Sequence, residues 1–174
     1  PERVEEAVEV GREVPESLGR YQIRGMLGEG GFGAVYLAFD GQLEREVAVK
    51  VPRRALKGVQ YEQFLQEARR VAQLRHPGIV SVFDVGEAEG CVYIVSDSIS
   101  GTTLTEWIQQ NKPDWKQSCE IIAGLADALG HAHTAGTVHR DVKPGNVIMT
   151  NENKPVLLDF GLAISAAEGG ELPG

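Results

Sequence analysis

Basic residues, cysteines and long apolar runs are all scarce in this sequence, and each shortage excludes a class of protein. The 174 residues hold 17 Lys and Arg against 25 Asp and Glu, which gives a net charge of −8. A nucleic-acid surface needs clustered positive charge, so we expect no nucleic-acid partner. No apolar run approaches the roughly 20 residues that cross a bilayer, so we expect no membrane contact from this segment. The two cysteines, Cys91 and Cys119, lack metal-type spacing, which indicates reduced thiols in a cytoplasmic protein.

The chain does have enough apolar content for a globular core, with 42% hydrophobic residues. Its first segment differs from the rest. Residues 1–19 contain six Glu and two Arg and lack core patterning, so we interpret them as an acidic linker. The sequence starts with Pro1 and shows no signal peptide, which predicts a piece excised from a longer protein.

Two kinds of hydrophobic period predict an α+β fold with two segments. A strand-like pattern with glycine punctuation fills the first segment and encloses one helix, and it predicts an antiparallel sheet. A helical pattern fills the second segment, which closes with a short β-hairpin, and the change falls at residues 97–101. We expect strands at residues 35–39, 47–51, 79–85, 91–96, 147–149 and 156–158, and helices at 61–75, 103–110 and 114–133, the last with Asp114 as N-cap.

The segment GEGGFG at residues 28–33 fits the pattern G-x-G-x-x-G. Such a pattern binds a dinucleotide only when a helix follows it, and here a strand-like run follows. We interpret the segment as a hairpin that lies over phosphates, because glycine has no Cβ and its backbone N–H groups can approach them closely. Taken alone the pattern is a weak signal, since any turn-rich hairpin can produce it.

A lysine and a glutamate of the first segment are predicted to pair. In the run 47–51, Lys50 shares a strand face with the small residue Ala48. On the helix at 61–75, Glu67 falls inside the apolar arc, where a carboxylate is costly unless a cation meets it. Lys50 is the candidate for that cation. The alternatives are an exposed edge lysine and a glutamate that reaches past the edge of the arc.

The most specific segments are HRDVKPGN at residues 139–146 and DFG at residues 159–161. Asn146 directly precedes one strand of the terminal hairpin and Asp159 directly follows the other, so hairpin closure brings both to one end. Their oxygens suit Mg²⁺, which shares its ligand shell with phosphates. Asp141 lies a few residues away and is placed to accept a hydroxyl proton. The alternative, a plain turn and a core histidine at His139, requires both segments to arise by chance.

With these segments in this order, the chain resembles eukaryotic-like serine/threonine protein kinases from about Leu18 to Ser165. The resemblance implies a protein-kinase-like two-lobe fold that transfers the γ-phosphate of ATP to Ser or Thr hydroxyls of protein substrates, with ATP and Mg²⁺ as cofactors. It implies an N-lobe of antiparallel sheet and one helix at residues 20–97, an incomplete, mainly helical C-lobe at 98–165, and a truncated activation-loop tail at 166–174.

The resemblance also implies roles for single residues near the phosphates. Asp141 is implied as the catalytic base, and Lys143 as the residue that neutralises the γ-phosphate. Lys50 is implied to grip the α- and β-phosphates and to pair with Glu67. The implied Mg²⁺ ligands are Asn146 and Asp159.

The remaining implied residues surround the nucleotide. The residues implied to bind it are Gly28, Gly30 and Gly33 over the phosphates, Val35, Ala48 and Ile148 around adenine, and the backbone of Asp97 and Ile99 at the adenine edge. His139 is implied to pack in a stack with Phe160 rather than to act as an acid or base.

The sequence departs from the kinase pattern in two places. The small Ser96 stands where the family commonly has a bulkier residue, which implies a back pocket open to larger ligands. After Ser165 there is no A-P-E segment and no later C-lobe helix, so we expect this chain to be an inactive or weak kinase by itself. We also expect self-association through exposed C-lobe surface.

Three functions compete for this sequence. The first is a protein serine/threonine kinase; the second is a non-catalytic nucleotide-binding or scaffolding fragment; the third is a small-molecule kinase of related fold. The presence of Lys50, Asp141 and Asp159 argues against a parent protein without activity. The context of Arg140 and Lys143 argues for a protein substrate.

Overall fold

The computed structural model describes residues 14–30, 33–53, 56–88 and 90–160. Most of the predicted linker, the tail at 166–174 and Gly161 of the DFG segment lie outside these ranges. The chain groups into two compact units, which are described separately: residues 1–58 with 80–100, and residues 59–79 with 101–174. The assignment of residues 20–97 to one lobe stays a prediction; by its contacts the helix at 59–71 groups with the second unit.

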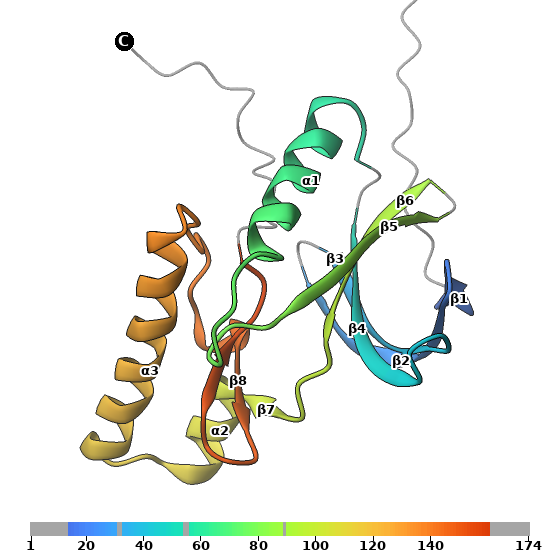
Figure 1. Cartoon of the computed structure of the whole chain (residues 1–174). Helices are drawn as coiled ribbons and strands as arrows, with labels where there is room; N and C mark the ends of the chain where they lie inside the picture. Colours follow the sequence, from blue (N-terminus) through green and yellow to red (C-terminus); the bar gives the residue numbers. More distant parts are fainter. Residues whose placement is uncertain (1–13, 31–32, 54–55, 89, 161–174) are drawn as a thin grey trace, which may run out of the picture. The chain divides into compact units, whose positions relative to one another are not determined.

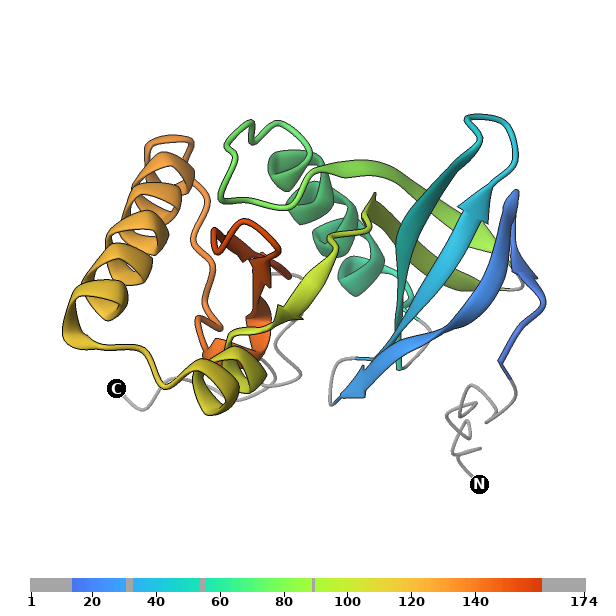
Figure 2. The ribbon, with the colours of Figure 1, turned by 90° about the horizontal axis from the view of Figure 1, so that it is seen from below.

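The first unit is a curved antiparallel sheet, with strand order β1-β2-β3-β4-β6-β5 (Figure 1). This confirms the predicted antiparallel sheet, although β3, β4 and β6 are longer than expected. Figure 2 shows how β2, β3 and β4 lie side by side as a meander. The strands are β1 (Ser17–Leu18), β2 (Tyr21–Gly30), β3 (Gly33–Asp40), β4 (Arg45–Pro52), β5 (Val82–Ala88) and β6 (Cys91–Asp97).

The core of the first unit lies on one face of this sheet. In β4, Val47, Val49 and Val51 are buried, while Ala48 and Lys50 on the opposite face are only half-buried. The period of two therefore predicted the face of Lys50 correctly. The apolar cluster that fills the buried face consists of Leu18, Tyr21, Tyr36, Ala38, Val47, Val49, Val51, Tyr93 and Val95.

The second unit combines helices with a small antiparallel sheet of order β7-β8-β9. Figures 1 and 2 show α3 beside the β8–β9 hairpin, with which it packs. The elements are α1 (Val59–Val71), β7 (Gly101–Thr103), α2 (Leu104–Asn111), α3 (Trp115–Thr134), the 3₁₀ turn η1 (Pro144–Asn146), β8 (Val147–Thr150) and β9 (Pro155–Leu157). Within the described residues, none of these helices has the length and hydropathy that a membrane span requires.

Capping residues fix where two of the helices begin. Asp114 accepts a hydrogen bond from the Gln117 backbone N–H at 2.8 Å, and the Gln117 side chain accepts one from the Asp114 N–H at 3.0 Å. This capping box confirms Asp114 as the N-cap of α3. Thr103 and Glu106 form the same arrangement at the start of α2.

Two predicted elements had wrong boundaries. The helix expected at 61–75 ends at Val71, because the amides of Gln73 and Leu74 donate to carbonyls three residues back and tighten the chain into a turn. The strand expected at 79–85 begins only at residue 82, and Ile79 instead forms an isolated parallel bridge with Leu157 of the second unit.

Candidate active site

Asp141 is the centre of a hydrogen-bonded cluster in the second unit. The Lys143 Nζ donates to its carboxylate oxygen Oδ2 at 2.7 Å, and the Asn146 Nδ2 donates to the same oxygen at 2.9 Å. Asn146 also donates to the Asp141 backbone oxygen at 2.8 Å. The structure thus brings together three of the predicted residues, two of them catalytic and one a metal ligand.

The cluster lowers the pKa of the Asp141 carboxyl below its ordinary value. The hydrogen bond from Lys143 is the largest cause, partial burial opposes it, and the hydrogen bond from Asn146 adds to it. The carboxylate is ionised at neutral pH, which is the form that can accept a proton from a hydroxyl group. The side chain is 32% exposed, so a hydroxyl group can reach it from solvent.

His139 holds the backbone on either side of this cluster. Its Nε2 lies 2.7 Å from the Leu158 carbonyl oxygen and therefore carries the hydrogen that it donates, while Nδ1 accepts the Asp141 N–H at 3.3 Å. The ring is 1% exposed and lies 4.6 Å from the Phe160 ring, centroid to centroid. With both nitrogens engaged and the ring buried, His139 has a packing role in this structure.

The β8–β9 hairpin places Asn146 beside the chain that leads to Asp159. The Leu158 backbone N–H donates to the Asn146 carbonyl oxygen at 2.9 Å, so the two segments run together at this end. Since Nδ2 of Asn146 is used by Asp141, its Oδ1 is the side-chain atom left for a metal. Amide and carboxylate oxygens are ligands that Mg²⁺ accepts, so Asn146 and Asp159 remain the predicted metal ligands.

The backbone is strained at two residues of this region. Arg140 has φ +65° and Asp159 has φ +55°, values in the left-handed region that residues other than glycine rarely adopt. Such strain collects at functional sites, where surrounding contacts impose it. The nearby Ile148, predicted to contact adenine, is half-buried in β8 and pairs with Thr103 and Val156.

In the first unit, the three glycines of the predicted phosphate hairpin differ in their surroundings. Gly28 and Gly30 lie at the exposed end of β2, and a Cβ added at either would meet no atom within 4 Å. Gly33 has φ +143°, and a Cβ there would overlap the Val51 carbonyl oxygen. Gly33 is therefore required by strand packing, whereas the fold leaves open space at Gly28 and Gly30.

The strand register places three predicted nucleotide residues of the first unit, Val35, Ala48 and Lys50, on one face of the sheet. Lys50 lies opposite Val35 of β3, and Ala48 lies opposite Ser96 of β6. Directly paired residues point to the same side of a sheet, so these four side chains share the face of Lys50.

The predicted adenine-edge residues follow from β6. The Asp97 N–H donates to the Ser81 carbonyl oxygen at 2.9 Å, which occupies its donor. Its carbonyl oxygen accepts a long hydrogen bond from the Ser96 Oγ, at 3.4 Å. Ile99 lies beyond the strand in irregular, half-buried backbone.

Glu67 is largely buried on α1, as its place in the apolar arc predicted. Its side chain is 14% exposed, and the Arg70 Nη1 donates to its Oε2 at 3.4 Å. Arg70 was not among the predicted partners of Glu67, although its i, i+3 spacing from Glu67 is the signal. Lys50 belongs to the other unit, and its pairing with Glu67 stays a prediction.

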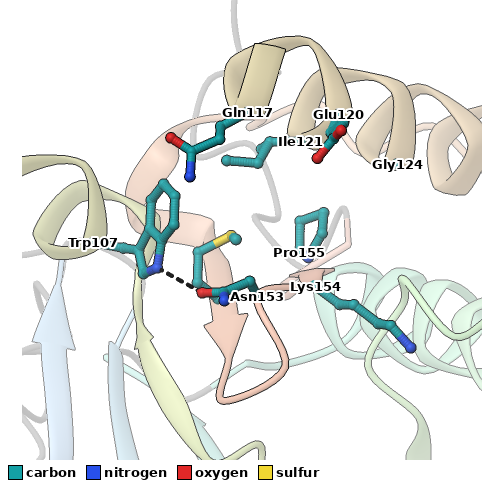
Figure 3. A pocket seen from close by; sticks show the side chains of 9 residues that line it. Trp107, Gln117, Glu120, Ile121, Gly124, Asn153, Lys154 and Pro155 are labelled. Atoms are coloured by element: carbon teal, nitrogen blue, oxygen red, sulfur yellow. Dashed lines mark hydrogen bonds between the residues drawn. The ribbon is translucent and has the colours of Figure 1, made fainter. Parts of the chain in front are cut away.

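A separate pocket lies between α2, α3 and the hairpin turn of the second unit, with a volume of about 440 Å³ (Figure 3). The Trp107 indole N–H donates to the Asn153 Oδ1 at 3.2 Å across its floor, and Pro155 faces Ile121 of α3. None of the predicted site residues lines this pocket.

The chain is similar to known proteins over most of its length. The family described as "Protein kinase domain" matches residues 21–172. The serine/threonine-protein kinase PknB of Mycobacterium leprae is 40% identical over 161 residues, which are 88% of this chain and 26% of that protein. The serine/threonine-protein kinase PrkC of Bacillus subtilis is 40% identical over 148 residues, or 83% of this chain and 23% of that protein. The chain thus spans about a quarter of the length of these relatives.

Solved structures agree with the sequence relatives. The apo form of PpkA-294 matches with a TM-score of 0.74 and 31% identity, over 87% of this chain and 62% of that one. The kinase domain of Mycobacterium tuberculosis PknI matches with a TM-score of 0.76 and 31% identity, over 87% of this chain and 63% of that one. These matches confirm the predicted fold class.

Proposed function

This chain belongs to the protein kinase family, and on that premise we propose that it carries the ATP-binding and catalytic segments of a protein serine/threonine kinase. The full protein then transfers the γ-phosphate of ATP to Ser or Thr hydroxyls of protein substrates. One observation carries the proposal: the Asp141 carboxylate, with its pKa lowered, is held by Lys143 and Asn146 at the end of the hairpin that leads to Asp159.

The first unit supplies nucleotide-binding groups. Gly28 and Gly30 have no Cβ, so phosphates can come close to their backbone N–H groups. Lys50 supplies a positive charge on the same sheet. The Asp97 carbonyl and the backbone of Ile99 supply hydrogen-bonding groups for an adenine edge. Val35 and Ala48 supply an apolar surface for the ring.

The second unit supplies the groups for phosphoryl transfer. Asp141 orients the acceptor hydroxyl and takes its proton, and Lys143 neutralises charge on the transferred phosphoryl group. Asn146 Oδ1 and the Asp159 carboxylate would hold Mg²⁺, which when bound neutralises phosphate charge. Catalysis by such a set depends mainly on position and charge, so the hydrogen bonds that fix Asp141 are part of the mechanism.

A nucleotide-binding or scaffolding function without turnover is the second candidate. The chain covers 62% of the PpkA-294 structure and 63% of the PknI structure, so a substantial part of each solved chain has no counterpart here. Phosphoryl transfer distinguishes the two functions, whereas nucleotide binding is common to both.

The nucleotide-binding part of the proposal is tested with Lys50→Ala and Asp159→Ala. Loss of a charge-assisted contact costs about 1.5–3 kcal/mol, so each variant is expected to bind Mg-ADP about 10- to 150-fold more weakly by calorimetry. Lys57→Ala removes a lysine of the same unit outside the predicted site and serves as the control. Wild-type affinity in both site variants would show that the residues are wrongly assigned.

A further inference from the structure

The loop that follows α1, residues 72–79, is attached to α3 through one histidine. The His76 Nε2 lies 3.0 Å from the Asp127 Oδ2. The His76 side chain is only 14% exposed, and its ring lies 5.2 Å from the His131 ring, centroid to centroid. Asp127, in contrast, is 80% exposed, so the contact is made at the edge of the unit.

The second ring nitrogen of His76 sets the conformation of its own loop. Nδ1 accepts the Gly78 backbone N–H at 3.0 Å, so in the neutral ring the hydrogen is on Nε2 and is donated to Asp127. One side chain therefore makes two directional contacts, one within the loop and one to α3.

Gly78 brings the loop close to both α3 and the hairpin. A Cβ added at Gly78 would lie 3.2 Å from the Ala128 Cβ, so no larger residue fits without displacement. The Gly78 carbonyl oxygen accepts the Leu157 backbone N–H at 2.8 Å, and Ile79 forms a parallel bridge with Leu157. The loop therefore pairs directly with β9.

The strand β9 leads directly to the predicted metal ligand. Leu157 is its last residue, and Asp159 follows two positions later. Between them, Leu158 bonds through its backbone to Asn146 and to His139. A shift of the 72–79 loop would thus be transmitted through Leu157 to the backbone that presents Asp159.

We propose that His76 is a positioning residue for Asp159. By joining its loop to Asp127 of α3, His76 fixes the loop residues that pair with β9, and hence the position of the metal-binding carboxylate. The same loop continues from α1, so His76 also fixes the C-terminal end of the helix that carries Glu67. The inference rests on the proposed function only where it concerns Mg²⁺ and nucleotide.

The first readout is hydrogen exchange of the Leu157 amide in the 174-residue chain without ligand. Asp127→Ala removes the partner on an exposed surface, and His76→Ala removes both contacts. We expect each to accelerate Leu157 exchange about five- to tenfold, the effect of losing one hydrogen bond. Asp127→Asn keeps an acceptor oxygen and should restore exchange close to the wild-type rate. His133→Gln, at an exposed histidine of α3, is the control.

The second readout is the gain in ADP affinity that Mg²⁺ provides. We expect this gain to fall about five- to tenfold in Asp127→Ala, with metal-free ADP affinity unchanged. The inference would be overturned if Asp127→Ala kept both the wild-type rate of Leu157 exchange and the wild-type gain in ADP affinity from Mg²⁺. This holds even if His76→Ala fails to fold. If the wild-type chain shows no Mg²⁺ gain at all, the proposed function fails, and Leu157 exchange alone then decides the inference.

Discussion

Asp141 receives hydrogen bonds from two side chains, and both belong to residues for which we propose other tasks in catalysis. Lys143 and Asn146 each contact the carboxylate oxygen Oδ2, within 2.7 and 2.9 Å. At the scale of single residues, this arrangement lowers the pKa of Asp141 and directs Nδ2 of Asn146, rather than Oδ1, at the carboxylate. Asp141 and Asn146 therefore fix each other's orientation.

The pKa of Asp141 tests this arrangement. Since Lys143 is the main cause of the lowered pKa, Lys143→Met should raise the Asp141 pKa toward its ordinary value near 3.8. A carboxyl whose pKa is lowered in the folded state stabilises the fold at pH values above its pKa in the unfolded state. That stability is lost as the pH falls through the folded-state pKa. The variant should therefore lose part of the stability that the ionised Asp141 provides at neutral pH. Carboxyl NMR titration measures the shift.

Lys154→Met is the matched control for that titration, because Lys154 pairs with the exposed Glu152 at 3.2 Å rather than with Asp141. The Asp141 pKa should be the same in this variant as in the wild type. An Asp141 pKa that does not rise in Lys143→Met would show that the lysine does not control the base.

Residue identities were more predictable than residue contacts. The spacing of Asn146 and Asp159 around the hairpin predicted that they meet at one end, and the Leu158 to Asn146 hydrogen bond agrees. The contact of Glu67 with Arg70 was missed, because several residues are near enough to pair with Glu67 and the sequence spacing does not show which one does.

At the scale of elements, the three glycines of the predicted phosphate hairpin differ in what the fold requires of them. Only Gly33 has a positive φ and a neighbouring carbonyl where a Cβ would be, whereas Gly28 has open space around it. Sequence pattern alone treats the three glycines as equal, since the distinction depends on how closely β3 passes the end of β4.

Alanine substitutions at Gly33 and Gly28 should therefore change different properties, the first stability and the second nucleotide affinity. Gly33→Ala should destabilise the fold by more than about 1 kcal/mol, because the left-handed backbone and the Val51 carbonyl both reject a Cβ. Gly28→Ala should leave the melting temperature nearly unchanged and weaken Mg-ADP binding. Thermal unfolding and calorimetry check the pair, and equal stability losses at the two positions would refute the distinction.

Element types were predicted better than element ends. Asp114 identified the start of α3 because a cap has a local sequence signature. The end of α1 was misjudged because Leu74 continues the apolar period while lying 2% exposed in a turn. β7 was not predicted, since the three residues Gly101–Thr103 are too few to show a period and form a strand only by pairing with β8.

At the scale of the whole chain, α3 presents large apolar side chains to solvent. Trp115 is 80% exposed and Ile122 is 65% exposed, and their spacing of seven residues puts them on one face of the helix. The net charge of −8 opposes contact between two copies. The predicted self-association should therefore strengthen as salt screens that charge.

Sedimentation velocity of the 174-residue chain tests this expectation. The sedimentation coefficient should rise with concentration, and more steeply at high salt than at low salt. Ile122→Lys should weaken the association although it reduces the net negative charge. Val59→Lys, at an apolar residue of α1 that is 73% exposed, should not. A monomer at every concentration and salt level would exclude self-association through this face.

The most direct test of the central claim is phosphoryl transfer by Asp141→Asn in the full-length protein that contains this chain. With γ-labelled ATP, the wild type is expected to label Ser and Thr of protein substrates, and the 174-residue chain to do so far more slowly. Asp141→Asn should lower turnover about 10²- to 10⁴-fold while Mg-ATP affinity changes less than about twofold, because a base acts in the transition state. Wild-type turnover in Asp141→Asn, or a wild type that labels no protein hydroxyl, would contradict the account.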